Sequence, residues 1–341
     1  MRFLKALFAF VIVVAIIAAG AAAYGWYWLQ GEVAAPGPMA KEYEFTIERG
    51  EALASIANRL EQDGLIADKR ILRLKARIDD VESDLKAGSY IVPAKSSVAD
   101  ILEQFIEGDV IEYRLTIPEG LTTAQILKRV EAATDLVGDL PERAFAEGVL
   151  LPDTYAFGAN TTRSQFLERM ETAQAALLEE LWPGRQADLP ISTPEEAIIL
   201  ASVVEKETAA ADERGIVAGL FVGRLKKGMR LESDPTIIYG VSRGEPLYNR
   251  RGQRRTLYRS EIDTKTDWNT YQIDGLPKTP ICNPGRDAIA AVLNPPTTEY
   301  VFFVADGKGG HLFAKTYAEH QRNVAAYRAY ERGEIARERE N

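Results

Sequence analysis

Hydrophobic positions follow different patterns in successive parts of the chain, and each pattern predicts a different kind of element. Residues 6–29 form one apolar run, which predicts a long helix. Between residues 43 and 130, short alternating segments precede segments with apolar residues at helical spacing, which predicts small strand–helix units. Residues 146–331 mix both patterns. The sequence therefore predicts an α+β fold: an N-terminal helix, small modules and a mixed domain.

The apolar run is long enough to cross a bilayer. No charged residue occurs from residue 6 to residue 31, and Ala6–Leu29 would span about 36 Å as a helix at about 1.5 Å per residue. Arg2 and Lys5 precede the run, so the positive-inside rule places the short N-terminus in the cytoplasm. Everything after residue 31 is then predicted to lie outside the cytoplasm.

A cleaved signal peptide is the alternative interpretation of this run. Residues 18–23 are small and of the kind that a signal peptidase accepts. The run continues beyond them into an aromatic cluster, residues 24–28, which is typical of the headgroup layer of a membrane. We therefore predict a retained transmembrane helix in residues 1–31, followed by a linker, residues 32–42, stiffened by Pro36 and Pro38.

A strand–helix unit occurs twice at an offset of seventy residues. Tyr43–Leu60 and Tyr113–Val130 each predict a strand, a turn glycine (Gly50 or Gly120) and an amphipathic helix. Between the two copies, residues 88–105 predict another strand, then a capping box and a helix. The helix of the first copy has a predicted buried stripe formed by Leu53, Ile56, Ala57 and Leu60.

Residues 43–93 resemble a LysM module, a fold that binds N-acetylated glycan chains. The resemblance rests on the segment GEALASIANRLEQDGLI. A turn glycine followed by an amphipathic helix is a common pattern, so a scaffold that spaces the following domain from the membrane remains an equal alternative. The expected organisation is LysM-like and second small modules over residues 43–145 and a catalytic domain over 146–331. A charged tail, 332–341, ends the chain.

One carboxyl group is predicted on the apolar face of a helix in the second half. Thr193 is followed by Pro194 and two glutamates, which predicts the start of a helix. Stepping by three and four residues from Ile198 leads to Ala201 and Glu205. Burial would raise the pKa of Glu205 and make it a proton donor near neutral pH. The alternative is a half-exposed glutamate that pairs with a lysine.

Composition excludes several other kinds of chemistry. The 41 Lys and Arg residues against 50 Asp and Glu give a net charge of -9, so we expect no nucleic-acid partner. The single cysteine, Cys282, cannot form an internal disulfide, and two histidines, His311 and His320, leave little for a metal site. We expect neither a metal nor a cofactor. His311 follows a glycine-rich hairpin turn, and we predict a polar packing role for it.

Five segments together resemble the membrane-bound endolytic murein transglycosylases, the MltG or YceG-like family. The resemblance spans nearly the whole chain. The segments are EGVLLPDTYAF at residues 147–157, LASVVEKET at 200–208, VAGLFVGRLKKGMRLESDPTIIYG at 217–240, WNTYQIDGLPKTPICNPG at 268–285 and YVFFVADGKGGHLFAKT at 300–316.

The resemblance implies roles for seven residues. It implies that Glu205, in the VEKET motif, is the catalytic acid and base. It also implies a glycan cleft, in which Tyr239 would offer a stacking face; the residues expected to line it are Ser233, Asp234, Tyr239, Asn269, Thr270 and Tyr271. For Asp234 and Asn269, capping of the local backbone is the alternative. Five arginines between residues 250 and 259 depart from the motifs, and we expect them to form a solvated loop.

The implied function is non-hydrolytic cleavage of peptidoglycan between N-acetylmuramic acid and N-acetylglucosamine, which leaves 1,6-anhydromuramyl ends and limits the length of nascent strands. The implied place is the bacterial inner membrane, crossed once, with the catalytic domain in the periplasm. Glycan strands, the membrane and peptidoglycan synthases are the expected partners. A muramidase that uses Asp234 as a second carboxylate is one alternative. A membrane-tethered glycan-binding scaffold is the other.

Overall fold

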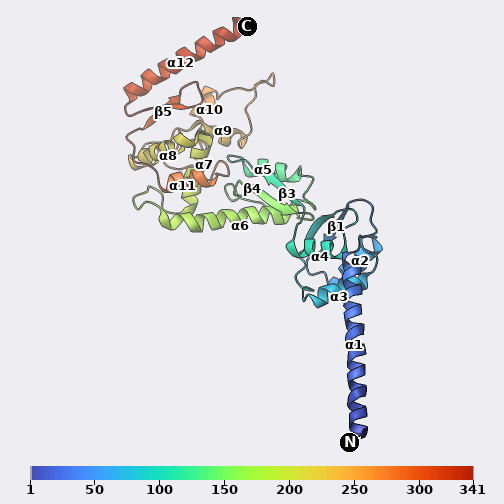
Figure 1. The fold of residues 1–341 in the computed structure, drawn as a ribbon. Helices are drawn as coiled ribbons and strands as arrows, with labels where there is room; N and C mark the ends of the chain where they lie inside the picture. The colour runs from blue at the N-terminus through green and yellow to red at the C-terminus, as the bar shows by residue number, and fades with distance from the viewer. Residues whose placement is uncertain (1, 341) are drawn as a thin grey trace. The chain divides into compact units, whose positions relative to one another are not determined.

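The computed structural model describes the backbone of residues 2–340 and the side chains of residues 7–332. It divides into two compact units, one formed by Met1–Tyr113 with Ala156–Asn160 and the other by Arg114–Tyr155 with Thr161–Asn341. Figure 1 labels many of the elements. In chain order they are α1 (Arg2–Ala34), β1 (Tyr43–Ile47), α2 (Leu53–Gln62), α3 (Lys69–Ile78), β2 (Gly88–Val92), α4 (Val98–Glu107), β3 (Glu112–Thr116), α5 (Thr123–Glu131), β4 (Thr154–Gly158), α6 (Arg163–Leu181), the short η1 (Trp182–Gly184), α7 (Pro194–Glu207), α8 (Ala211–Lys226), α9 (Asp234–Ser242), α10 (Arg259–Asp263), α11 (Arg286–Leu293), β5 (Phe302–Ala305), β6 (His311–Ala314) and α12 (Tyr317–Glu340).

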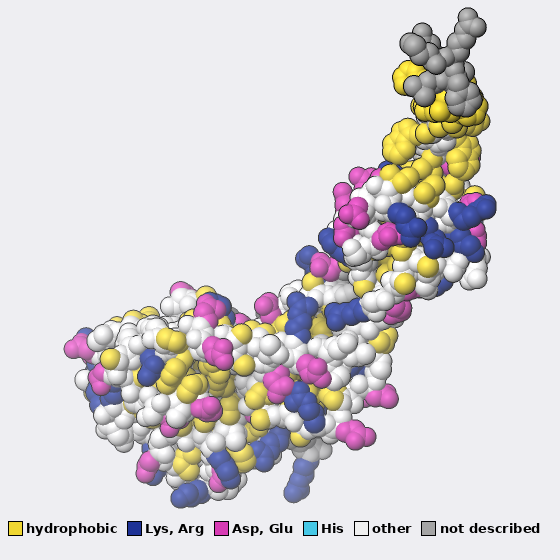
Figure 2. Space-filling view, turned by 90° about the horizontal axis from the view of Figure 1, so that it is seen from below, with side chains coloured by type: hydrophobic (Ala, Val, Ile, Leu, Met, Phe, Trp, Pro, Cys, Tyr) yellow, Lys and Arg dark blue, Asp and Glu magenta, His cyan; other side chains and the backbone are white. Residues whose placement is uncertain are grey.

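Helix α1 contains a segment long and apolar enough to cross a membrane. This segment, Leu7–Ala34, contains an 18-residue window with a mean hydropathy of 2.6, and hydrophobic side chains cover much of the helix surface that is visible in Figure 2. Its last turns differ, because Leu29 and Val33 are buried in the core of the first unit. The fold is thus mixed α and β with one N-terminal apolar helix, which is consistent with a membrane anchor.

The first unit confirms the predicted pattern of its elements. Strands β1 and β2 pair antiparallel with Phe45 opposite Tyr90, and all four residues of the predicted stripe on α2 are buried. Gly50 has a φ of 76°, which a glycine adopts without strain. The predicted capping box begins α4 at Ser97. The glycan-binding role of residues 43–93 stays a prediction.

The second copy of the strand–helix unit forms as expected but belongs to the second unit of the structure. Strand β3 leads through Gly120, with a φ of 75°, into α5. The Gly120 N–H donates to the Asn283 carbonyl (3.1 Å), and the Asn283 N–H donates to the Leu121 carbonyl (2.8 Å). These bonds join the second copy to a loop of the later domain. The chain enters the second unit after Tyr113. The functional division at residue 145 stays a prediction.

Helix α7 lies at the centre of the second unit's core and packs against α8, α9 and α11. The Thr193 hydroxyl caps it by accepting the Glu196 N–H (3.2 Å), as the sequence predicts. Its apolar residues do not form one stripe, because it is buried on nearly all sides. The buried residues are Ala197, Ile198, Leu200, Ala201, Ser202, Val203 and Val204.

An antiparallel hairpin and a long helix complete the second unit. Strands β5 and β6 form the predicted hairpin, with Phe302 opposite Ala314. Helix α12 packs against both strands. It extends to Glu340 and so includes most of the segment that the sequence analysis assigns to a charged tail. Asn341 lies outside the described residues.

Candidate active site

The last turn of α7 presents three charged residues in a row, and each contacts a different loop of the second unit. A helix buried on nearly all sides has neighbours all around its end, so consecutive side chains meet different segments. Glu205 Oε2 accepts the Gly285 N–H (3.0 Å), Lys206 Nζ donates to the Gly120 carbonyl (3.0 Å), and the Ser233 hydroxyl donates to Glu207 Oε1.

Glu207 lines a cavity of about 560 Å³. Asp234, the first residue of α9, and Tyr271 lie in the same wall. Most of the other lining residues come from β5, from His311 in β6 and from α12. The complete lining consists of Glu207, Arg224, Glu232, Asp234, Tyr271, Phe302, Phe303, Val304, Ala305, His311, His320, Val324 and Arg328. This volume lies within the range of small-molecule sites.

The pKa of Glu207 is raised to about 7. Burial is the main cause, since it disfavours the charged carboxylate. The negative charge of Asp234 raises the pKa further, and the hydrogen bond from Ser233 lowers it. Glu207 therefore holds its proton close to neutral pH and can donate it to a bound group.

Asp234 and Tyr271 are linked to each other beside Glu207. The Tyr271 hydroxyl donates to Asp234 Oδ1 (2.8 Å), and burial raises the pKa of that hydroxyl. Ser233 contributes its hydroxyl to Glu207 although only 1% of the residue is exposed. Three of the residues that the sequence analysis assigns to a glycan cleft thus gather around one carboxyl group.

Glu205 occupies a different environment. It is half-buried, it is not among the residues that line the Glu207 cavity, and it accepts a hydrogen bond from Gly285 at the start of α11. Burial is also the main cause that raises its pKa, the Gly285 N–H opposes this, and the charge of Glu119 adds to it.

The helix does not deliver Glu205 as a lone carboxyl group, because Glu207 lies two residues further on and burial raises the pKa of both. Counting in steps of three and four from Leu200 through Val203 would have led to Glu207. The sequence does not distinguish this series from the one through Ile198 and Ala201, because both consist of apolar residues. In the structure, residues of both series are buried.

The expectation that Asn269 and Thr270 line a cleft is also wrong. Neither has exposed surface. The Asn269 amide nitrogen donates to three backbone carbonyls of residues 261–264, and its oxygen accepts the Tyr271 N–H (3.0 Å). The Thr270 hydroxyl accepts the Ser233 N–H (3.0 Å). These side chains shape the loops on which Ser233 and Tyr271 stand, which corresponds to the capping role weighed for Asn269.

Asn269→Ala is expected to lower the free energy of unfolding by about 2 to 3 kcal/mol, because it removes a fully buried side chain that hydrogen-bonds three backbone carbonyls and the Tyr271 N–H. Denaturant unfolding measures this change. Lys265→Ala, in the same loop but exposed, is the control and should stay within about 0.5 kcal/mol of the wild type. An Asn269→Ala protein with wild-type stability would contradict the structural role.

Tyr239 does not offer a stacking face. Only 7% of it is exposed. Its hydroxyl donates to Glu147 Oε2 (3.1 Å), and its ring meets the edge of Trp268 at a centroid distance of 5.6 Å. The ring is therefore part of the packing behind the loops, and this expectation is corrected.

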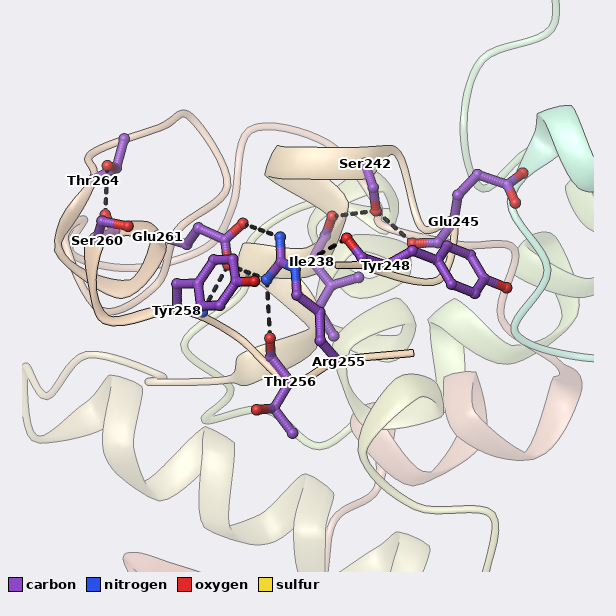
Figure 3. Close-up of polar contacts among 10 residues, drawn as sticks. All are labelled: Ile238, Ser242, Glu245, Tyr248, Arg255, Thr256, Tyr258, Ser260, Glu261 and Thr264. Atoms are coloured by element: carbon purple, nitrogen blue, oxygen red, sulfur yellow. Dashed lines mark hydrogen bonds and ion pairs between the residues drawn. The ribbon is translucent and has the colours of Figure 1, made fainter. Parts of the chain in front are cut away.

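The arginine-rich segment forms local contacts around Arg255 (Figure 3). The Arg255 guanidinium makes two hydrogen bonds to Glu261, each 2.7 Å, and stacks on the Tyr258 ring at 3.9 Å. Arg259 pairs with Asp263 (3.0 Å). Both arginines pair within their own segment. Arg259 is exposed, as expected for a solvated loop, whereas the Arg255 side chain is only 15% exposed.

The fold and this site define a class: a mixed α and β protein in which a polar cavity is lined by a carboxyl group with a raised pKa, as in enzymes that use general acid catalysis. The sequence profile of the YceG-like family matches residues 45–326, and the chain belongs to this family.

Relatives of this chain carry the name endolytic murein transglycosylase. The protein of Streptococcus pneumoniae serotype 2 is 27% identical over 93% of this chain, which spans only 64% of that protein's length. The protein of Bacillus subtilis is 24% identical, over 92% of this chain and 91% of its own. A crystal structure of a YceG-like protein from Listeria monocytogenes, 25% identical, covers 83% of this chain and 99% of its own with a TM-score of 0.47.

Proposed function

We propose that this chain cleaves peptidoglycan glycan strands between N-acetylmuramic acid and N-acetylglucosamine, with Glu207 as the proton donor. The observation that carries the proposal is a carboxyl group with a pKa of about 7 in the wall of a cavity of about 560 Å³. Membership in the YceG-like family and the name of the relatives give the substrate class. Glu205, which the sequence analysis places in this role, instead fixes the Gly285 loop in the proposal.

The proposed chemistry begins with proton transfer from Glu207 to the oxygen of the glycosidic bond. The bond between the anomeric carbon and this oxygen breaks as positive charge develops on the sugar. The 6-hydroxyl of the muramyl residue then attacks the anomeric carbon and gives its proton to a base on the protein. This hydroxyl is tethered to the reacting sugar, so its attack has the advantage of an intramolecular reaction. The product is a 1,6-anhydromuramyl end.

The Asp234 side chain would stabilise that developing charge, with the Tyr271 hydroxyl holding it in place. The same arrangement favours one alternative. A hydrolase needs a second carboxylate to activate water, and Asp234 lines the same cavity as Glu207. A muramidase that uses Glu207 and Asp234 is therefore the second candidate function.

The product separates these two functions. We expect glycan strands digested by the full-length protein in water enriched in oxygen-18 to carry anhydromuramyl ends without label. Mass spectrometry measures the label and the missing water. Labelled reducing ends as the main product would favour the muramidase, and strands that stay uncut while bound would favour the scaffold.

The proposed place of action is outside the cytoplasm. The apolar helix Leu7–Ala34 would anchor the chain, and Arg2 and Lys5 before it favour a cytoplasmic N-terminus. The second unit would then work in the periplasm next to the inner membrane, where new strands are made. Control of strand length, contact with synthases and glycan binding by residues 43–93 stay predictions.

A further inference from the structure

A second titratable group faces the cavity of Glu207, and a carboxylate holds it in place. His311, the first residue of β6, lies with its Nδ1 at 2.6 Å from Glu213 Oε2. The backbone N–H of His311 donates to the other oxygen, Glu213 Oε1 (2.8 Å). Both side chains are 15% exposed. The Glu213 carboxylate thus contacts both the backbone N–H and the ring Nδ1 of His311.

This contact assigns the tautomer of the imidazole. An ionised carboxylate only accepts hydrogen bonds, so the proton of a neutral His311 ring lies on Nδ1. Nε2 then carries a lone pair and can accept a hydrogen bond or a proton. Histidines whose Nδ1 is held by a carboxylate in this way act as bases in other enzymes.

The contact with Glu213 lets the ring present Nε2 to the cavity. His311 lines the cavity, whereas Glu213 is not among the residues that line it. Nδ1 faces Glu213, and Nε2 lies on the opposite part of the ring. The ring meets the edge of Phe303 at a centroid distance of 5.3 Å and an angle of 79°, which restricts its rotation.

The chain builds this pair from distant segments. Glu213 lies in the first turn of α8, and the turn between β5 and β6 approaches it closely. A Cβ at Gly310 would lie 2.8 Å from Glu213 Oε1, so glycine is required for this approach unless the carboxylate moves. The glycine at position 310 thereby allows the hairpin turn to bring His311 to Glu213. Polar packing alone would not require so close an approach.

We propose that His311, oriented by Glu213, is the base that takes the proton of the attacking hydroxyl during cleavage. As this oxygen bonds to the anomeric carbon, its proton passes to His311 Nε2. The electron pair of the broken glycosidic bond goes to the leaving oxygen, which takes the proton of Glu207. The step leaves His311 as an imidazolium and Glu207 as a carboxylate. Transfer of one proton from the ring to the carboxylate through solvent restores the starting state of both. The inference rests on the proposed function and adds a separate base to it.

Two variants and a rescue experiment test this role on glycan strands with the full-length protein. Glu213→Gln keeps the oxygen that accepts the backbone N–H but presents an amide N–H to Nδ1, which moves the ring proton to Nε2. We expect kcat to fall about 100-fold or more with little change in KM. His311→Ala should lose as much, and added imidazole should restore part of it. Glu299→Gln, which removes only the exposed pair with Lys315, is the matched control and should keep wild-type turnover.

The outcomes separate this inference from the proposed function. Cleavage by the wild type together with wild-type kcat in either variant would overturn the role of His311. A loss of kcat in both variants, with no rescue of His311→Ala by imidazole, would also overturn it, because a packing role predicts that result. If the wild type itself does not cleave the strands, the proposed function fails instead.

Discussion

Glu207→Gln is expected to reduce glycan cleavage by about 100- to 10,000-fold, the range for loss of a general acid. Glutamine has the size of the protonated glutamate and can accept the same hydrogen bond from Ser233, but it has no proton to give to the leaving oxygen. The fold should be kept, because glutamine resembles the neutral form of the side chain, which the wild type carries below about pH 7. Turnover on glycan strands and circular dichroism measure the two effects.

Glu205→Gln is the matched control, since it makes the same change two residues earlier on the same helix. Its amide oxygen can still accept the Gly285 N–H, so we expect cleavage to fall far less than in Glu207→Gln. If Glu205→Gln loses cleavage and Glu207→Gln keeps it, the acid is Glu205, as the sequence analysis proposes, and the assignment made from the cavity is wrong.

Cleavage is expected to decline as the pH rises through about 7. Glu207 must carry its proton to act as an acid, and burial with the charge of Asp234 raises its pKa to about 7. Above this value kcat/KM should fall about tenfold per pH unit. A pH profile measures this. A flat profile from pH 6 to 9 would contradict a proton donor with this pKa.

The same pKa predicts an effect on stability. The folded protein binds the Glu207 proton more tightly than the unfolded chain, whose pKa is the ordinary 4.5. Its contribution to stability is therefore present below pH 4.5 and is lost as the pH rises through about 7. The Tm of the wild type should fall relative to that of Glu207→Gln between pH 5 and pH 8. A difference in Tm that does not change with pH would contradict the raised pKa.

Local patterns predict much of this fold. The turn glycines at Gly50 and Gly120, the capping box at Ser97 and the start of α7 at Thr193 all depend on nearby residues, and each forms as predicted. The β5–β6 hairpin is of the same kind. Such features follow from backbone sterics and short hydrogen bonds, which a sequence displays directly.

The site depends on contacts between distant segments, and there the sequence misleads. A stripe identifies the buried face only when a helix has one, and α7 is buried on nearly all sides. The sequence motif that contains Asn269 is compatible with lining a cleft and with capping the backbone. Only its hydrogen bonds to residues 261–264 show that its role is structural. Glu213 and His311 lie 98 positions apart, so no local pattern connects them.

The most direct test of the central claim is a structure of the full-length Glu207→Gln protein, solubilised in detergent, with a bound glycan oligomer. The account predicts that the glycan lies in the cavity between α9 and the β5–β6 hairpin. The oxygen of one glycosidic bond should lie about 2.6 to 3.2 Å from the side-chain amide at position 207. A glycan that instead lies against Glu205 and the Gly285 loop, with the cavity empty, would contradict it.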